Sequence, residues 1–129
     1  MSGIFAQRTA PSDIVDTVTR YHQAIEAQDF EAIESFFAET AVYLSDGVGV
    51  LEGREAIVAG FRAYFAEYAD QTNEDETVEA ISPRAVRSVW KLKATSARTG
   101  QTTIRAGEET VFFDTDGLIE KVIVRDRRR

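Results

Sequence analysis

The stretch that decides the fold is TTIRAGEETVFFDTDGLIEKVIV, residues 102–124. Its first half, Thr102 to Phe113, is rich in β-branched and aromatic residues, which favours a long strand. Asp116-Gly117 then supplies a dipeptide typical of tight hairpin turns, and an apolar pattern resumes from Leu118 to Val124. We therefore predict an antiparallel hairpin that closes the C-terminal end of a sheet.

Two further strands are predicted before this hairpin. From Val86 to Ala94, small or apolar residues alternate with a set that includes Arg87 and Lys91. This period of two is typical of an antiparallel strand with one exposed face. Thr77 to Ile81 is predicted to be the strand before it. Four consecutive strands with no helix between them predict a meander.

The N-terminal part has helical periodicity instead. One apolar face of a first helix is formed by Ile14, Val18, Tyr21 and Ile25. Ser12 is its expected N-cap, and the helix is predicted to run to about Gln28. Asp29 is expected to cap a second, shorter helix. The residues of this second helix that should be buried are Phe30, Ile33, Phe36 and Phe37.

A small hairpin and a third helix follow. Ala41 to Ser45 is predicted to be a strand, Asp46-Gly47 a turn, and Val50-Leu51 the partner strand. The third helix starts near Arg54 and carries Ile57, Phe61, Tyr64, Phe65 and Tyr68 along one side. Helices grouped first and strands last predict an α+β fold, in which the helices cover one face of a curved sheet.

Composition limits the class of protein. The 129 residues are 43% hydrophobic and 29% charged, which suits one globular domain with a core of its own. With no cysteine, disulfides, zinc–thiolate sites and cysteine nucleophiles are excluded, and a cytoplasmic location is expected. The net charge of −7 disfavours nucleic acid and anionic membranes as partners. We expect an N-terminal extension at 1–11, one domain at 12–126 and a basic tail at 127–129.

Charge is unevenly distributed along the chain. An acidic stretch contains Glu74, Asp75, Glu76 and Glu79, and a basic end contains Arg125, Arg127, Arg128 and Arg129. Charge runs of this kind are usually solvated surface, and we interpret both in that way.

Four segments resemble the NTF2-like superfamily, which includes SnoaL-like cyclases and ketosteroid isomerases. They are TRYHQAIEAQD (19–29), FFAETAVY (36–43), LEGREAI (51–57) and FFDTDGLI (112–119), and the resemblance spans about residues 12–126. It implies a cone-shaped domain with three N-terminal helices covering a curved antiparallel sheet. Since this superfamily contains isomerases, dehydratases, cyclases, epoxide hydrolases and association domains, the fold does not select a function.

The resemblance to ketosteroid isomerases implies roles for particular residues. Tyr21 matches their tyrosine that donates a hydrogen bond to a substrate enolate, and Glu109 matches a carboxylic acid kept protonated in an apolar site. Together the two would form an oxyanion hole. The base that these isomerases need matches Ser45, and a slip of one residue would bring Asp46 to that place. Serine alone does not abstract a carbon-bound proton at neutral pH, so Asp46 is the candidate base.

Each candidate also has a structural interpretation. Tyr21 lies on an apolar helix face and could be a core residue; Glu109 could be exposed; Asp46 before a glycine is a turn former. Alternation along the strand predicts that Glu109 points inward together with Val111 and Phe113. His22 lies about 100° round the helix from Tyr21, so we place it at the edge of the core or on the surface, and one histidine alone gives no metal site.

The predicted inward residues suggest a pocket. The convergent set is Tyr21, Ile25, Tyr43, Phe61, Phe65, Trp90, Val111 and Phe113, with Ser45 beside it. Aromatic side chains with few polar groups usually line sites for flat or cyclic apolar molecules. The alternative is that these side chains fill the core completely.

Two functions follow from these observations. The first is a cofactor-independent enzyme of isomerase, cyclase or dehydratase type that transfers a proton on a hydrophobic carbonyl compound. The second is a non-catalytic ligand-binding or association domain. Outward apolar residues such as Phe112 and Val89 predict a homodimer through the outer sheet face. The Arg125-Asp126 pair resembles an arginine followed by an acid in epoxide hydrolases of the superfamily, but it lies about two residues further along the chain.

Overall fold

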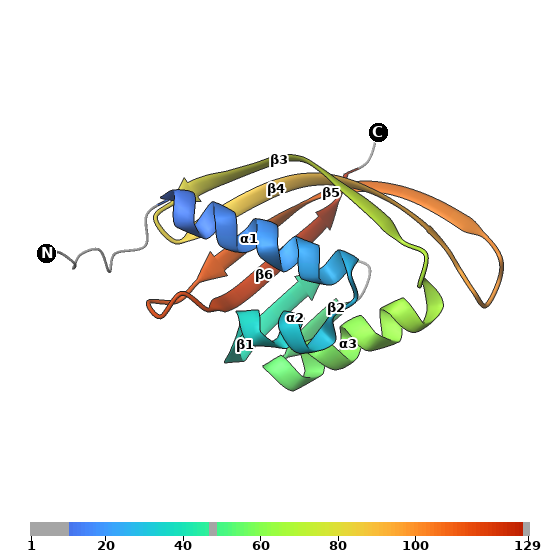
Figure 1. Ribbon diagram of the computed structural model, residues 1–129, viewed down its shortest axis with the longest axis horizontal. Coiled ribbons are helices and arrows are strands. Elements are labelled where there is room, and N and C mark those ends of the chain that lie inside the picture. The colour runs from blue at the N-terminus through green and yellow to red at the C-terminus, as the bar shows by residue number, and fades with distance from the viewer. Residues whose placement is uncertain (1–10, 47–48, 128–129) are drawn as a thin grey trace, which may run out of the picture.

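A computed structural model describes residues 11–46 and 49–127 (Figure 1). Its helices are α1 (Pro11–Glu26), α2 (Phe30–Phe36) and α3 (Arg54–Glu67). Its strands are β1 (Phe37–Ser45), β2 (Gly49–Glu52), β3 (Thr72–Ser82), β4 (Ala85–Thr95), β5 (Thr102–Phe113) and β6 (Ile119–Asp126). Most of the expected N-terminal extension, the side chain of Ser12, Gly47 of the expected turn and the last two residues of the basic tail lie outside the described residues.

The second helix, α2, is short because Asp29 caps its start and the extended backbone of Phe37 ends it. Asp29 is its N-cap, and the Asp29 carboxylate accepts a hydrogen bond from the backbone N–H of Ala32 at 3.2 Å, as predicted. Phe37 was expected to lie in this helix, but its backbone is extended and it is the first residue of β1. Phe37 is nevertheless fully buried, because a strand starting there still directs its ring into the core.

The sheet has the order β2-β1-β6-β5-β4-β3. Strands β3 to β6 form the predicted antiparallel meander. The expectation of a wholly antiparallel sheet needs one correction, because β1 pairs with β6 in parallel. This pairing joins the N-terminal hairpin to the meander and makes one six-stranded mixed sheet.

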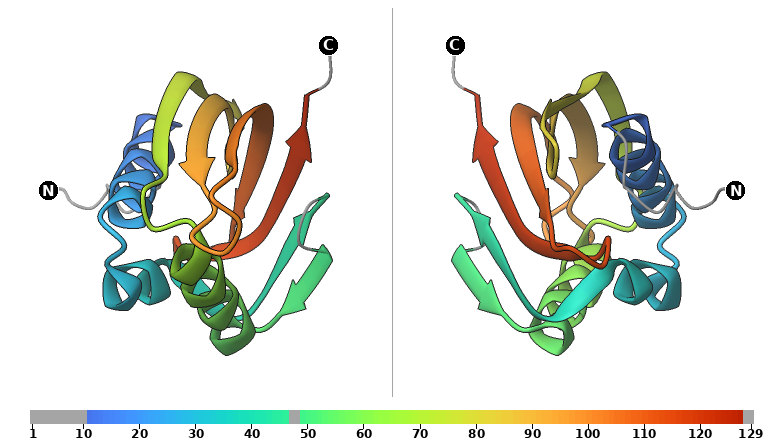
Figure 2. Two further views of the ribbon diagram at one scale, coloured as in Figure 1. Left: turned by 90° about the vertical axis from the view of Figure 1, so that its right-hand side faces the viewer. Right: turned by 90° about the vertical axis from the view of Figure 1, so that its left-hand side faces the viewer.

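The helices close the open side of the curved sheet (Figures 1 and 2). Helix α1 packs against β3 and β4, α3 packs against β1 and β2, and α2 contacts both other helices. The core between these layers includes Ile14, Ile33, Phe37, Ile57, Val86 and Phe113. None of the helices in the described part of the chain combines the length and the apolar character needed to cross a membrane.

Strand β3 begins five residues earlier than the sequence predicts, at Thr72 rather than Thr77. The added residues belong to the acidic stretch, yet they alternate between exposed and half-buried positions. Asn73 and Asp75 take the half-buried positions, whereas Glu74 and Glu76 are exposed. The stretch is therefore solvated on only one face.

Trp90 packs directly onto the backbone of the neighbouring strand. Its partner residue in β5 is Gly107. A Cβ atom built on Gly107 would lie 2.5 Å from Trp90 Cζ2 and 2.6 Å from the backbone oxygen of Arg125. The absence of a side chain at position 107 therefore lets the indole lie close against the sheet.

We expect Gly107→Ala to destabilise the fold by about 1–3 kcal/mol, the usual cost of overpacking, because neither the indole nor the Arg125 backbone can move easily. Gly60→Ala is the matched control. A Cβ there would lie 2.7 Å from Leu51 Cδ1, the end of a flexible side chain, and alanine is also the better helix former. Denaturant unfolding followed by circular dichroism measures both. Equal free energies of unfolding for the two variants would contradict this account.

Candidate active site

A cavity of about 130 Å³ lies between the helices and the inner face of the sheet. Its aromatic lining consists of Tyr43, Phe61, Tyr64, Phe65 and Trp90. Its polar lining consists of His22, Ser45, Gln71, Asn73, Arg105 and Glu109. An apolar cavity of about 150 Å³ is enough to bind benzene, so this one has room for about one ring.

Six of the ten residues selected from the sequence line this cavity: Tyr43, Ser45, Phe61, Phe65, Trp90 and Glu109. The two others from the inner face of β5, Val111 and Phe113, are buried in the core instead. They point inward as the alternation predicts, but they lie where the core is closed by apolar side chains.

The remaining two candidates, Tyr21 and Asp46, do not line the cavity. Tyr21 is fully buried with its ring edge-on to Phe37, and its hydroxyl has no hydrogen-bond partner among the described residues. Asp46 is exposed at the end of β1, where its carboxylate accepts from the backbone N–H of Asp126 at 3.3 Å. That contact ties the ends of β1 and β6 together.

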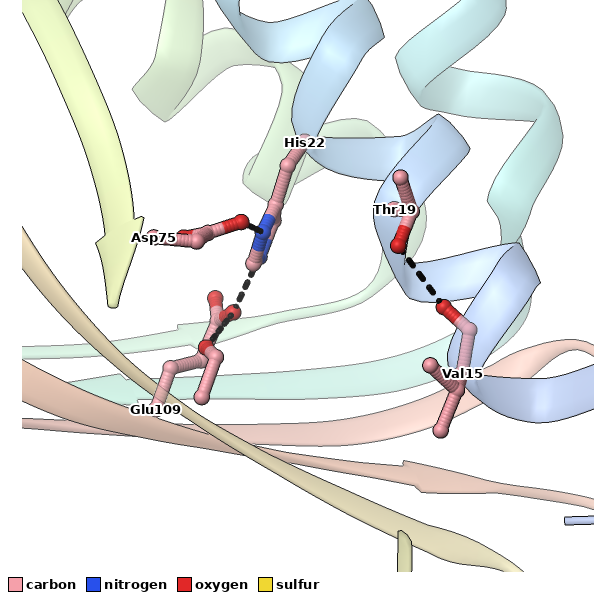
Figure 3. Close-up of polar contacts among 6 residues, drawn as sticks. Val15, Thr19, His22, Asp75 and Glu109 are labelled. Atoms are coloured by element: carbon pink, nitrogen blue, oxygen red, sulfur yellow. Dashed lines mark hydrogen bonds and ion pairs between the residues drawn. The ribbon is translucent and has the colours of Figure 1, made fainter. Parts of the chain in front are cut away.

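The polar centre of the site is His22, which lies between two carboxylates (Figure 3). Its Nδ1 is 2.7 Å from Asp75 Oδ2, and its Nε2 is 2.6 Å from Glu109 Oε1. The three side chains come from α1, β3 and β5. Exposure falls along the chain of contacts, from 24% for Asp75 to 11% for His22 and 7% for Glu109.

This environment keeps His22 protonated. Burial by itself lowers the pKa of the imidazole, but the negative charge of Glu109 and the hydrogen bonds to both carboxylates outweigh it and raise the pKa to about 10. Near neutral pH, His22 is therefore an imidazolium that donates one N–H to each carboxylate. Ser88, buried next to Glu109, makes a further weak contact of 3.5 Å to Oε1.

Sequence reasoning missed both His22 and Asp75. His22 was expected at the core edge or surface, but it is largely buried and lines the cavity, while Tyr21 takes the core position. Asp75 was assigned to solvated surface. The signal that could have found it is the period of two in residues 72–76, which places Asn73 and Asp75 on one face and the glutamates on the other.

Arg105 adds a cation on the same face of the sheet. Its guanidinium donates to Asp126 Oδ1 at 2.6 Å and lies 5.9 Å from the centre of the Trp90 ring. The acid of the Arg125-Asp126 pair is thus joined to an arginine on β5 and not to its neighbour in sequence. Burial, reinforced by Glu109 and opposed by Arg105, raises the pKa of Tyr43 well above its ordinary value, so its hydroxyl stays protonated.

The cavity offers acid–base groups, and its ligand set for a metal is poor. Both ring nitrogens of His22 already face carboxylates. Within residues 11–46 and 49–127, no three histidine, cysteine, aspartate or glutamate side chains are gathered so as to hold a metal ion.

Solved structures share the fold. The chain is similar to SalBIII, an epoxide hydrolase/cyclase-like enzyme with a role in forming the pyran ring of salinomycin, with a TM-score of 0.79 and 19% identity over 90% of this chain and 92% of that one. It is similar to an epoxide hydrolase of the LEH-like type from M. tuberculosis, with a TM-score of 0.78 and 14% identity over 91% and 84%. A ketosteroid isomerase-like protein from Erwinia carotovora atroseptica gives a TM-score of 0.71 and 16% identity over 97% and 100%.

Identities this low show a common fold alone. Among curated proteins, no relative matches the chain. The family model for the SnoaL-like domain matches residues 18–122, which run from the middle of α1 to the middle of β6. The chain therefore belongs to the SnoaL-like family.

Proposed function

We propose that the protein is a cofactor-independent enzyme of isomerase or cyclase type, which transfers a proton on a ring-sized, hydrophobic molecule bearing a carbonyl group. The observation that carries this proposal is a nearly buried carboxylate, Glu109, at the wall of an aromatic cavity and held by an imidazolium. Perturbed ionisable groups in an apolar pocket are typical of sites that perform acid–base chemistry.

Glu109 is the proposed base. Its carboxylate removes a proton from the carbon next to the substrate carbonyl, and the electron pair of the C–H bond moves to give an enolate. The neutral acid then returns the same proton to another carbon of the conjugated system, which restores the carboxylate. Positioned acid–base groups of this kind contribute typically about 10²–10⁴-fold to a rate.

The enolate oxygen needs donors, and the cavity supplies two. Tyr43 keeps its proton, as its raised pKa requires, and Arg105 carries a fixed positive charge. Preorganised donors aimed at the developing charge are usually the largest contribution to such catalysis. This assigns to Tyr43, on β1, the part that the resemblance gave to Tyr21, on α1. Asp46, outside the cavity lining, has no part in the step.

His22 and Asp75 are positioning residues in this proposal. The imidazolium donates to Glu109 Oε1 and fixes its position, while Asp75 fixes the imidazolium from the other side. The names of similar proteins, which include a cyclase-like and a ketosteroid isomerase-like protein, fit this class of reaction. A binding domain that uses the same cavity without conversion is the alternative that the first experiment addresses.

We expect the protein to convert 3-cyclohexen-1-one into the conjugated 2-cyclohexen-1-one, followed by ultraviolet absorbance and by NMR in D₂O. Glu109→Gln should lower turnover by about 10²–10⁴-fold, because the amide cannot accept the proton. Glu108→Gln is the matched control, since Glu108 is the preceding residue in β5 and faces away from the cavity. It should keep wild-type turnover.

The single tryptophan, Trp90, lines the cavity and reports binding separately from conversion. Quenching of its fluorescence by the ketone without turnover would show that the protein is a binding domain and not this enzyme. Equal turnover in wild type and Glu109→Gln would remove Glu109 from the mechanism.

The raised pKa of His22 also predicts a pH dependence of stability. The folded-state pKa of His22 is about 10, above its ordinary value of 6.5, so the stabilisation is complete below about pH 6.5 and is lost as the pH rises through about 10. The stability difference between wild type and His22→Gln should therefore shrink by roughly a few kcal/mol between about pH 7 and pH 10.5. Arg20→Gln, which breaks an exposed ion pair on the same helix, should show no such change.

The homodimer stays a prediction. Phe112, beside Lys121, and Val89 are half-buried on the outer face of the sheet, so we propose that this face pairs with a second copy. Sedimentation velocity at micromolar concentration should give a dimer, and Phe112→Asp should shift it to monomer. Ile104→Asp, at a 77% exposed position away from the centre of the face, is the control. A wild-type monomer would contradict the proposal.

A further inference from the structure

Helix α3 has one glycine, and it lies on the face of the helix that lines the cavity. The residues of α3 on this face are Ile57, Gly60, Phe61, Tyr64 and Phe65. Glycine in the middle of a helix is less favourable than alanine, and α3 has alanine at its exposed positions 59, 63 and 66. The glycine therefore occurs where the helix faces the cavity, at a cost in helix propensity that its contacts there explain.

The contact that requires glycine is made by Leu51. This residue is on β2, against which α3 packs, and it lines the cavity next to Gly60. A Cβ atom built on Gly60 would lie 2.7 Å from Leu51 Cδ1 and 3.8 Å from Leu51 Cδ2. The end of the leucine side chain thus occupies the place that a side chain at position 60 would take, which means that Leu51 rests on the bare backbone of α3.

Leu51 belongs to the same wall as the proposed oxyanion donor. Its register partner in β1 is Tyr43, and directly paired residues of neighbouring strands have their side chains on the same face of the sheet. The Tyr43 ring packs edge-on against Phe61 of α3, with 5.7 Å between the ring centres. The two rings hold each other in place, so the aliphatic Leu51 is the adjustable member of this wall.

We propose that Leu51 is a specificity-determining residue that excludes molecules with a second, fused ring, and that Gly60 sets its position. The cavity of about 130 Å³ has room for about one ring, and Leu51 closes it on the side of β2. Loss of the leucine side chain extends the cavity toward α3, whereas a side chain at position 60 displaces Leu51 and narrows it. That the excluded molecules are substrates rests on the proposed function.

The test compares a one-ring ketone, cyclohexanone, with a fused two-ring ketone, 2-decalone, by titration of Trp90 fluorescence. Wild type should bind cyclohexanone more tightly. Leu51→Ala should raise the affinity for 2-decalone relative to cyclohexanone by about tenfold or more, which corresponds to about 1.4 kcal/mol. Comparing ratios removes any effect of the substitution that is common to both ligands.

The part played by Gly60 is tested with a double-mutant cycle. Gly60→Ala alone should lower the relative affinity for 2-decalone by about fivefold or more, because the displaced Leu51 takes up space that the second ring needs. In the Leu51→Ala background the same change should have less than about a twofold effect, since the side chain that it displaces is gone.

Val50→Ala is the matched control, because Val50 precedes Leu51 in β2, is 61% exposed and is not part of the cavity lining. It should leave the ratio within about twofold of wild type. Leu51→Val, with a smaller shift in the same direction, replaces Leu51→Ala if circular dichroism shows that the latter is unfolded. The proposal would be overturned by an unchanged ratio in the Leu51 variant, by an effect of Gly60→Ala that is absent or that persists without Leu51, or by a failure of both ketones to bind.

Failure of this inference and failure of the proposed function are distinguishable. Conversion of 3-cyclohexen-1-one that depends on Glu109, with no change of ratio in Leu51→Ala, would leave the function and remove Leu51 as the specificity-determining residue. The reverse pattern, a changed ratio without any conversion, would leave Leu51 as the size limit of a binding site in a protein that is not this enzyme.

Discussion

The imidazolium of His22 between Asp75 and Glu109 is the interaction on which the site depends. Three buried or half-buried charges are stable there only because each carboxylate receives a hydrogen bond from the same cation. Removal of one partner from such a group leaves another charge buried without compensation, which commonly costs about 3–5 kcal/mol. The contact also joins α1 to β3 and β5, two of the strands that line the cavity.

The shape of the cavity depends on a second constraint, the close approach of Trp90 to Gly107. Because position 107 has no Cβ, the indole lies close against the sheet, where it lines the cavity. The parallel pairing of β1 with β6 then brings Tyr43 and Ser45 to the same face. A wholly antiparallel meander would contain neither residue, so this irregular join supplies the proposed donor for the enolate.

The fold could be predicted to a large extent, because local patterns carry it. Periods of two and of 3.6 residues, the Asp116-Gly117 turn and the Asp29 cap each specify a local structure that the whole fold preserves. The parallel join of β1 could not be predicted, since no residue in β1 encodes its distant partner in β6. The early start of β3 was missed for another reason: its acidic composition masked an alternation that only Asn73 and Asp75 reveal.

The site was predicted only in part, because neighbouring residues of α1 point in different directions. Consecutive residues are about 100° apart, so Tyr21 and His22 cannot both face the cavity. The resemblance to isomerases selected Tyr21, but the apolar stripe of α1 directs Tyr21 into the core beside Phe37 and turns His22 toward Glu109. This exchange changes the chemistry of the carboxylate. A tyrosine hydroxyl would give the Glu109 carboxylate one neutral hydrogen-bond donor, whereas His22 gives it a charged one. In the proposed mechanism Glu109 therefore removes the proton, and the donor to the oxyanion is Tyr43, which lines the same cavity from β1.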